Sequence, residues 1–187
     1  NKEADAVISA GNTGALLVIA KLNLKMIENI DKPALSALWP NKKGMSVVLD
    51  LGANIECSSK NLLDFSIMGA SLYTSLYPNE KPNVALLNIG SEELKGNETI
   101  KETYHLLKEK KSDNYNFSGY IEGNHLMDGN VNVIVSDGFT GNVALKTAEG
   151  TANFITTELK NAMTGSILGK ISSILNISNL KKFKKRL

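Results

Sequence analysis

Runs of apolar residues alternate with helical patterns along most of the chain. Short continuous runs occupy residues 5–10, 46–49, 84–89, 117–121 and 131–135. Runs of this length bounded by polar residues are typical of buried strands, whereas apolar residues three and four positions apart indicate a helix. Helices that alternate with strands favour a mostly parallel sheet with helices on its faces. The pattern therefore predicts an α/β fold.

Helices are predicted between and after these strands. The first begins near Asn12 or Thr13, either of which is a suitable N-cap, and its apolar positions extend to Ile27. The second begins near Asn61, and the third covers residues 97–110. Each of these helices follows one of the predicted strands.

Three further features concern packing. Gly69 lies inside the second helix, where glycine costs about 1 kcal/mol relative to alanine, and this indicates close packing against a neighbour. Residues 34–38 form another apolar segment, and residues 39–44 are predicted to form a polar turn. The helix that follows residue 142 should pack its apolar face on the sheet. That face consists of Leu145, Ala148, Thr151, Ala152, Ile155, Leu159 and Met163.

Four of the predicted strand ends share one chemical character. Residues 9–14, 50–54, 88–98 and 137–142 each combine glycine with amide, hydroxyl or carboxylate side chains. The carboxyl ends of parallel strands lie along one edge of a sheet, which is where such folds bind ligands. The sequence therefore predicts a single cleft, with Lys95 as a cation beside a helix N-terminus that can hold an anion.

The last part of the chain differs from the rest. Apolar residues recur at helical spacing from Ile167 onward, and five of the 21 basic residues lie in the last eight positions. A basic amphipathic segment can lie in an anionic membrane interface, or it can bury its apolar stripe against its own domain or a partner chain. The pattern leaves both alternatives open. We divide the chain into an α/β core, residues 1–165, and an amphipathic basic helical segment, residues 166–187.

Composition narrows the classes of function. A chain of 187 residues is the size of one domain, and its net charge of +2 argues neither for nor against nucleic acid. One cysteine, Cys57, and two histidines, His105 and His125, are too few for a disulfide framework or a familiar Cys/His zinc site. No apolar run approaches the roughly 20 residues that span a bilayer. We expect a cytoplasmic protein that associates at most peripherally with a membrane.

Neither a Gly-x-Gly-x-x-Gly motif nor a P-loop occurs, but the ordered strand ends carry a resemblance. Residues 9–15 (SAGNTGA), 50–54 (DLGAN), 87–98 (LNIGSEELKGNE), 121–123 (IEG) and 137–142 (DGFTGN) resemble motifs of the bacterial phosphate acyltransferases of phospholipid synthesis, the PlsX family. The resemblance runs from Ala4 to the end of the chain, and members of that family are longer at both ends.

The resemblance implies a fold, a reaction and partners. The fold would be a three-layer α/β/α arrangement like that of isocitrate and isopropylmalate dehydrogenases, in a homodimer. The reaction would transfer a long-chain acyl group from acyl carrier protein to inorganic phosphate, forming acyl phosphate, without a cofactor or an obligatory metal. A membrane surface would be a further partner, because the family's helices beyond the last motif touch the membrane. We expect no nucleic acid partner.

This chemistry suits the residues, because phosphate can attack a thioester directly and no serine or cysteine nucleophile is needed. It requires a held phosphate and donors to the developing oxyanion. We assign Lys95 to phosphate binding and Asn142 to the thioester oxygen or phosphate, as the catalytic residues. The predicted substrate and phosphate contacts are Asn12, Thr13, Gly14, Asn54, Gly96, Asn97 and Gly141.

Several alternatives remain at this stage. The acids Asp50, Glu92, Glu93, Glu98 and Asp137 could hold a metal, but we prefer turn, capping and supporting roles for them. A phosphate acetyl- or butyryltransferase that uses coenzyme A thioesters would share the fold and the phosphate chemistry. A decarboxylating dehydrogenase is less favoured, and a membrane-associated scaffold without activity is the alternative that is not an enzyme.

Overall fold

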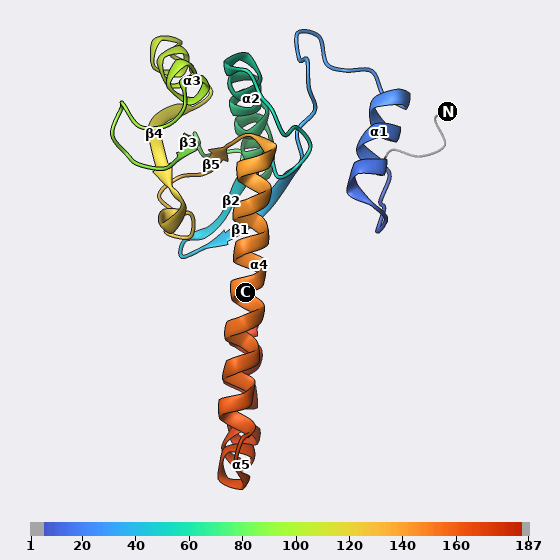
Figure 1. The fold of residues 1–187 in the computed structure, drawn as a ribbon, viewed down its shortest axis with the longest axis vertical. Coiled ribbons are helices and arrows are strands. Elements are labelled where there is room, and N and C mark those ends of the chain that lie inside the picture. Colours follow the sequence, from blue (N-terminus) through green and yellow to red (C-terminus); the bar gives the residue numbers. More distant parts are fainter. Residues whose placement is uncertain (1–5, 185–187) are drawn as a thin grey trace.

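A five-stranded sheet forms the centre of the computed structural model, which describes residues 6–184 (Figure 1). Its strands are β1 (Ser36–Asn41), β2 (Gly44–Leu49), β3 (Asn83–Asn88), β4 (Asn116–Glu122) and β5 (Val133–Val135). They lie in the order β1-β2-β5-β3-β4. Only β1 runs antiparallel to its neighbour, whereas β2, β5, β3 and β4 are mutually parallel. The predicted mostly parallel α/β sheet is confirmed.

Alternate residues of the central strands face opposite layers, as the period of two in a strand requires. One face packs under α2 (Ser59–Leu76) and α3 (Glu98–Glu109), and the other packs against the start of α4 (Gly138–Thr164). The first core contains Val47, Leu49, Phe65, Val84, Leu86, Val133 and Val135. The second contains Trp39, Val48, Ala85, Leu87, Leu126 and Ile134, with Leu145 and Ala148 packed against it. These layers form the predicted α/β/α arrangement.

Helix α2 begins two residues before the predicted start, because Ser58 and Asn61 form a reciprocal capping box. Gly69 lies over the sheet, where an added Cβ would come within 2.5 Å of Val133 Cγ1 and 2.8 Å of Leu49 Cδ2. The predicted close packing at Gly69 is therefore confirmed. Periodicity along this helix would place Leu76 on the same face as Phe65 and Gly69, but Leu76 is 45% exposed at the end of α2.

The turn between β1 and β2 is shorter than predicted. Residues 39–41 continue the strand, and Trp39 is 4% exposed in the core opposite Ser46. The turn itself consists of Lys42 and Lys43. The prediction of a polar turn over residues 39–44 is wrong because strand pairing and burial of the indole outweigh the turn preference of the Pro40-Asn41 pair.

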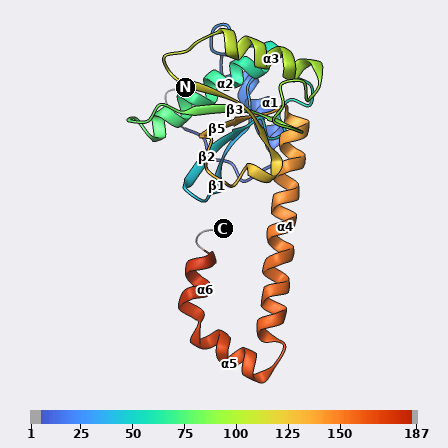
Figure 2. The ribbon, with the colours of Figure 1, turned by 90° about the vertical axis from the view of Figure 1, so that its left-hand side faces the viewer.

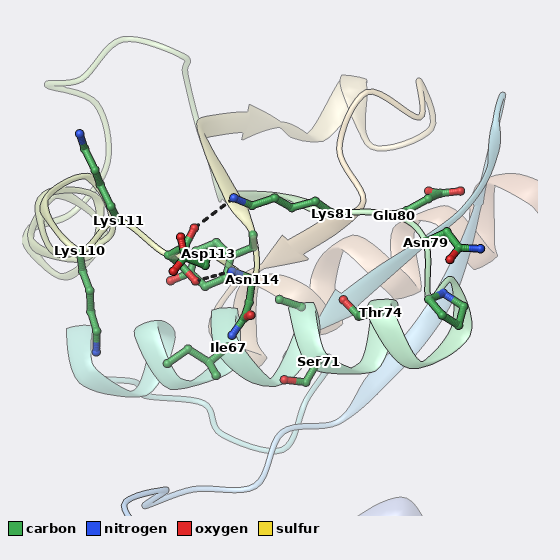
Figure 3. Close-up of a pocket in the computed structure, with 14 residues that line it drawn as sticks. Ile67, Ser71, Thr74, Asn79, Glu80, Lys81, Lys110, Lys111, Asp113 and Asn114 are labelled. Carbon is green, nitrogen blue, oxygen red and sulfur yellow. Dashed lines mark hydrogen bonds between the residues drawn. The ribbon is translucent and has the colours of Figure 1, made fainter.

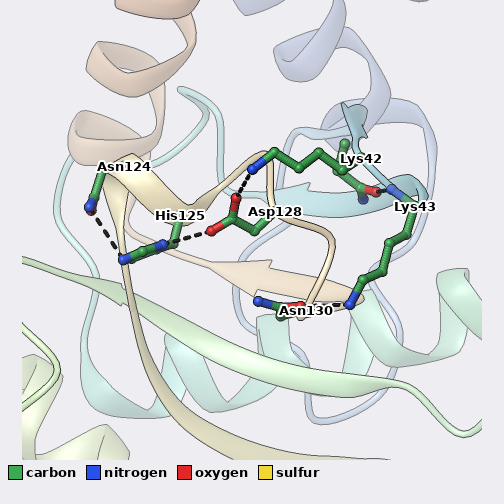
Figure 4. Close-up of polar contacts among 7 residues, drawn as sticks. Lys42, Lys43, Asn124, His125, Asp128 and Asn130 are labelled. Atoms are coloured by element: carbon green, nitrogen blue, oxygen red, sulfur yellow. Dashed lines mark hydrogen bonds and ion pairs between the residues drawn. The ribbon is translucent and has the colours of Figure 1, made fainter.

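A polar cluster ties this turn to the loop between β4 and β5 (Figure 4). Lys42 Nζ lies 2.7 Å from Asp128 Oδ1, and His125 Nδ1 lies 2.7 Å from Asp128 Oδ2. Lys43 Nζ donates to Asn130 Oδ1 at 2.6 Å. Hydrogen bonds from Lys42 and then from His125 hold the pKa of the Asp128 carboxyl below its usual value.

The first predicted strand is absent from the described part of that segment. Residues 6–10 are irregular and exposed, and Asp5 lies outside the described residues. An isolated strand leaves its backbone groups unpaired, and no described strand lies beside this segment. Helix α1 (Thr13–Asn23) follows with Asn12 as its N-cap, as predicted, but it ends before Ile27.

Helix α4 leaves the domain and projects away from it (Figures 1 and 2). Its 27 residues correspond to about 40 Å, whereas six-residue strands span only about 20 Å. The prediction that its whole apolar face packs on the sheet is therefore wrong beyond Ala148. Ile155 is 52% exposed and Leu159 is 38% exposed.

Two short helices turn back after the end of α4 (Figure 2). They are α5 (Ile167–Leu175) and α6 (Ile177–Lys184), and α5 packs along the end of α4. We call α4 from residue 149 onward, together with α5 and α6, the hairpin. No helix among residues 6–184 is long and apolar enough to cross a membrane.

Candidate functional site

Three of the four predicted polar segments meet at one edge of the sheet. Asp50 follows β2, Asn88 ends β3, and Ser136 follows β5, and these strands are parallel neighbours. The fourth segment, residues 9–14, does not follow a described strand. It reaches the same edge through the first turn of α1, because Thr13 and Gly14 line a cavity there with Gly52 and Asn142.

The buried carboxylate of Asp50 organises the first of these segments. It accepts hydrogen bonds from the backbone N–H groups of Leu35, Gly52, Ala53 and Asn54, at 2.8–3.1 Å. The Asn54 side-chain amide donates to Asp50 Oδ2 and to the Pro33 carbonyl, each at 2.7 Å. These hydrogen bonds hold Asn54 in the turn. Asp50 stabilises the turn, which is the role that the sequence analysis favours over metal binding.

The start of α4 packs directly against this turn. Asp137 is the N-cap, and its two oxygens accept from the Thr140 backbone N–H and the Thr140 hydroxyl at 2.8 Å. A Cβ at Gly138 would come within 2.6 Å of the Asn54 carbonyl oxygen, and one at Gly141 would overlap the Asp50 carbonyl oxygen. Gly141, predicted as a substrate contact, therefore has a clear structural role in letting the helix approach the strand end.

We call the first cavity at this edge the Asn142 cavity; it measures about 370 Å³. Its lining includes the polar side chains of Thr13, Asn142 and Lys146, and also Gly14, Gly52 and Ala53. Its remaining walls are apolar and come from α1, the two strand ends and α4, namely Leu16, Leu17, Ala20, Leu35, Leu51 and Leu145. The Asn142 amide makes no hydrogen bond within residues 6–184, so it can serve a ligand.

A second cavity, of about 470 Å³, lies where three helices begin, and we call it the helix-start cavity. Its lining includes Cys57 just before α2, Asn97 and Thr99 at the start of α3, and Asp137 and Thr140 at the start of α4. Unpaired N–H groups and the helix dipoles make each N-terminus favourable for anions. Three of them border this cavity, together with the carboxylates of Glu56 and Asp137, which oppose part of that effect.

The loop between β3 and α3 carries Lys95. The buried Asn88 side chain donates to the Lys95 carbonyl at 3.1 Å, and Gly96 lies against Asn88 with φ +94°, a conformation that favours glycine. Asn97 then caps α3 by accepting from the Ile100 N–H at 2.9 Å. The Lys95 side chain is exposed, and its ammonium has no ion pair within the described residues. It lines neither cavity directly.

Two further acids near this loop, Glu93 and Glu98, have ion-pair partners, whereas Glu92 forms no ion pair within residues 6–184. Glu93 Oε1 lies 3.4 Å from Lys108 Nζ and 3.9 Å from His105 Nδ1. Glu98, in the first turn of α3, pairs with Lys101 at 3.1 Å. Within residues 6–184, no group of three or more His, Cys, Asp or Glu side chains is arranged to hold a metal ion.

The structure thus sorts the predicted site residues into groups. Thr13, Gly14 and Asn142 share the Asn142 cavity, and Asn97 borders the helix-start cavity. Asn12 caps α1 beside the first cavity and accepts from the Ala15 N–H. Asn54, Gly96 and Gly141 are in the surrounding framework. Their substrate contacts, and those of Lys95, stay predictions.

Sequence reasoning missed Lys146 and the apolar walls of the Asn142 cavity. Lys146 lies four residues after Asn142 and therefore on the same face of α4, a spacing that could have revealed it. Its ammonium lies 2.8 Å from Glu149 Oε2. The apolar walls come from α1, β2 and α4 together, so no local pattern identified them.

A larger cavity lies elsewhere, near the beginnings of β3 and β4 (Figure 3). It measures about 780 Å³ and is lined by residues of α2, the segment before β3 and the loop after α3. Lys81 donates to the Ser112 carbonyl across it at 3.2 Å. None of the predicted site residues lines it, so size alone does not identify the candidate site.

The fold is similar to that of one solved structure. EutD phosphotransacetylase from Staphylococcus aureus matches with a TM-score of 0.58 at 16% sequence identity. The match covers 72% of this chain and 46% of that protein. This likeness supports the fold alone.

Sequence relatives are much closer. The chain is 79% identical over 186 residues to a protein from Pelagibacter ubique named phosphate acyltransferase, covering 100% of this chain and 56% of that protein. It is 45% identical to proteins of the same name from Maricaulis maris and Caulobacter vibrioides, covering 99% of this chain and 53% and 51% of those proteins. The chain therefore spans about half the length of these curated relatives.

The family described as "Fatty acid synthesis protein" matches residues 1–187, the whole chain. This match and the identities to curated members agree with the resemblance carried by the strand-end motifs. The chain therefore belongs to this fatty acid synthesis protein family.

Proposed function

We propose that the full-length protein is a phosphate acyltransferase that moves a long-chain acyl group from acyl carrier protein to inorganic phosphate, forming acyl phosphate for phospholipid synthesis. The observation that carries this proposal is that the first turns of α4 border two cavities, a largely apolar one that contains Asn142 and one at three helix N-termini. One suits an acyl thioester and the other suits phosphate. The names of the close relatives support the same activity.

The proposed chemistry needs only positioning and charge stabilisation. A phosphate oxygen attacks the thioester carbonyl carbon, the carbonyl oxygen becomes an oxyanion, and the C–S bond then breaks to release the thiolate. Asn142 donates to the oxyanion, and the helix N-termini bind the phosphate. Lys95 lines neither cavity but lies two residues before Asn97, and we assign it the positive charge that helps to bind the phosphate. Burial raises the pKa of the Cys57 thiol, which disfavours the thiolate form that a covalent mechanism would need.

Two substitutions in the full-length protein test these roles. Lys95→Ala and Asn142→Ala should leave the protein folded and lower acyl phosphate formation, with a loss of about 10²–10³ in kcat for an oxyanion donor. Circular dichroism and the unfolding midpoint establish that each variant is folded. Near-normal turnover in both variants would overturn the assignment.

The nature of the acyl donor is tested by a direct comparison. Acyl carrier protein thioesters and coenzyme A thioesters carry the same reacting group, and the protein with the similar fold is a phosphotransacetylase. We expect the acyl carrier protein thioester to give the higher kcat/KM. A preference for acetyl- or butyryl-coenzyme A would favour the second candidate function.

We also propose that the hairpin contacts a membrane surface. The α5 residues Ile167, Leu168, Ile171, Ile174 and Leu175 are 52–80% exposed, so the described domain does not cover their stripe. Exposed Lys170, Lys181 and Lys182 accompany it, and each basic residue near an anionic surface contributes about 1 kcal/mol. Binding should be stronger to anionic than to neutral liposomes and should weaken with salt. Failure to bind either kind at low salt would contradict this.

The expected homodimer is a separate proposal with a separate measurement. Exposed apolar residues of the hairpin could also be buried against a second copy, which would remove them from a membrane. Sedimentation equilibrium of the full-length protein without lipid should give twice the monomer mass. A monomer at all concentrations would contradict the dimer without affecting the acyl-transfer assignment.

A further inference from the structure

Three cavities follow one another along a single face of α4. The Asn142 cavity shares Leu145 with a groove of about 470 Å³ between β1 and α4, which we call the strand-edge groove. That groove shares Ala152 with a third cavity, of about 540 Å³, between α4 and the returning helices. The shared residues make the Asn142 cavity and the strand-edge groove neighbours along the helix.

The periodicity of both walls explains the alignment. On α4, Asn142, Leu145, Ala148 and Ala152 are three or four residues apart and therefore lie on one face. On the strand side, Leu35 borders the Asn142 cavity, and Ala37 and Trp39 border the groove at alternate positions. Ala148 lies about 9 Å and Ala152 about 15 Å along the axis from Asn142.

The lining of the strand-edge groove is apolar where it faces inward. Its apolar lining consists of Leu38, Trp39, Pro40, Met127, Leu145 and three alanines, at positions 37, 148 and 152. The two charged residues at the groove are already paired, Lys42 with Asp128 at 2.7 Å and Glu149 with Lys146 at 2.8 Å. A hydrocarbon chain fits this lining better than a charged peptide does, because it leaves those ion pairs intact.

We propose that the strand-edge groove binds the distal part of the substrate's fatty acyl chain, and that Ala148 and Ala152 set the longest chain accepted. The carbonyl end would lie at Asn142 and the chain would run past Leu145 along α4. The small side chains at positions 148 and 152 leave space for the chain at two successive distances from Asn142. This inference rests on the proposed acyl transfer and adds the location of the chain and the residues that limit its length.

Leucine at either position should shorten the preferred acyl chain in a graded way. In the full-length protein, Ala148→Leu should lower the ratio of kcat/KM for palmitoyl- over octanoyl-acyl carrier protein by about tenfold or more, the effect of losing a few buried methylenes. Ala152→Leu should lower the same ratio less, because it blocks the groove farther from Asn142. Thr147→Leu, on the exposed opposite face of α4, is the matched control and should leave the ratio unchanged.

A binding measurement provides a readout independent of turnover. Trp39 is the single tryptophan of this chain and lines the groove, while its indole Nε1 is buried without a hydrogen-bond partner in residues 6–184. Adding palmitic acid should change the fluorescence emission of Trp39. The contribution of Trp39 is obtained by subtracting the emission of the Trp39→Phe variant from that of the unsubstituted protein. Ala148→Leu should weaken this response, and Thr147→Leu should not.

The outcomes separate this inference from the proposed function. If the unsubstituted protein transfers acyl groups but the chain-length ratio is the same in all three leucine variants, the inference is overturned and the function stands. The inference is also overturned if the protein is active but palmitic acid does not change the emission of Trp39. That result is expected if another segment of the longer protein fills the groove. Absence of acyl transfer from any thioester to phosphate overturns the proposed function itself.

Discussion

The two halves of α4 share one apolar periodicity but have different surroundings. Up to Ala148 the helix contacts the sheet and the Asp50 turn, and beyond it the same apolar periodicity continues with Ile155 and Leu159 exposed. The period of a helix identifies its apolar face, but it does not say what covers that face. The first half of α4 therefore positions the candidate site, whereas the second half has an exposed apolar face that a partner can cover.

The largest expected contrast is between a core leucine and a hairpin leucine. Leu86 is 0% exposed in β3, and Leu168 is 80% exposed in α5. Leu86→Ala should lower the free energy of unfolding by about 2–5 kcal/mol through lost burial and a cavity. Leu168→Ala should change it by about 0.5 kcal/mol or less. Urea unfolding of the full-length protein measures both, and equal losses would show that the hairpin stripe is buried.

Two glycines of α4 provide the next contrast. Gly141→Ala places a methyl group onto the Asp50 carbonyl and should cost about 1–3 kcal/mol or more. Gly150→Ala meets no atom within 4 Å and should stabilise the helix by roughly 0.5–1 kcal/mol. Thermal unfolding should therefore shift in opposite directions. A shift in the same direction would contradict the different packing of the two halves.

The helix caps give a smaller contrast. Asp137→Ala removes both bonds to Thr140 at the start of α4 and should cost about 1–2 kcal/mol. Ser166→Ala removes the bond to the Gly169 N–H at the start of α5, where less tertiary structure depends on the helix. Its effect on the global unfolding midpoint should be within about 0.5 kcal/mol. A larger loss for Ser166→Ala would mean that α5 unfolds together with the core.

The smallest expected effect is a pH dependence of stability that comes from Asp128 in the polar cluster beside the β1–β2 turn. The folded pKa of Asp128 is lowered, so its contribution to stability is present above the ordinary carboxyl pKa and is lost as pH falls through the lowered value. Asp128→Asn should therefore be less stable than the unsubstituted protein at neutral pH, with the difference shrinking in acid below about pH 4. Unfolding midpoints at several pH values measure this. A difference that grows on acidification would contradict the ion-paired cluster.

Part of the candidate site could be predicted from local patterns. The turn after Asp50, the cap at Asn97 and the polar start of α4 each follow from residues within a few positions of one another. The structural roles of Gly141 and Gly96 could not be predicted. Gly141 lies against the Asp50 carbonyl, which is distant in the sequence, and Gly96 lies against the Asn88 side chain at the end of β3. The Asn142 cavity likewise needs α1, two strand ends and α4 together.

The sequence by itself determined the strands β2 to β5, the helices after them and the shared polar edge, because local periodicity and capping residues encode those features. The tertiary structure decided three things that local patterns do not contain. It excluded residues 6–10 from the described sheet, it extended β1 through Trp39, and it carried α4 beyond the sheet. The reason is common to all three: a strand needs a partner for its backbone, and an apolar face needs a neighbour to cover it, and both come from distant parts of the chain.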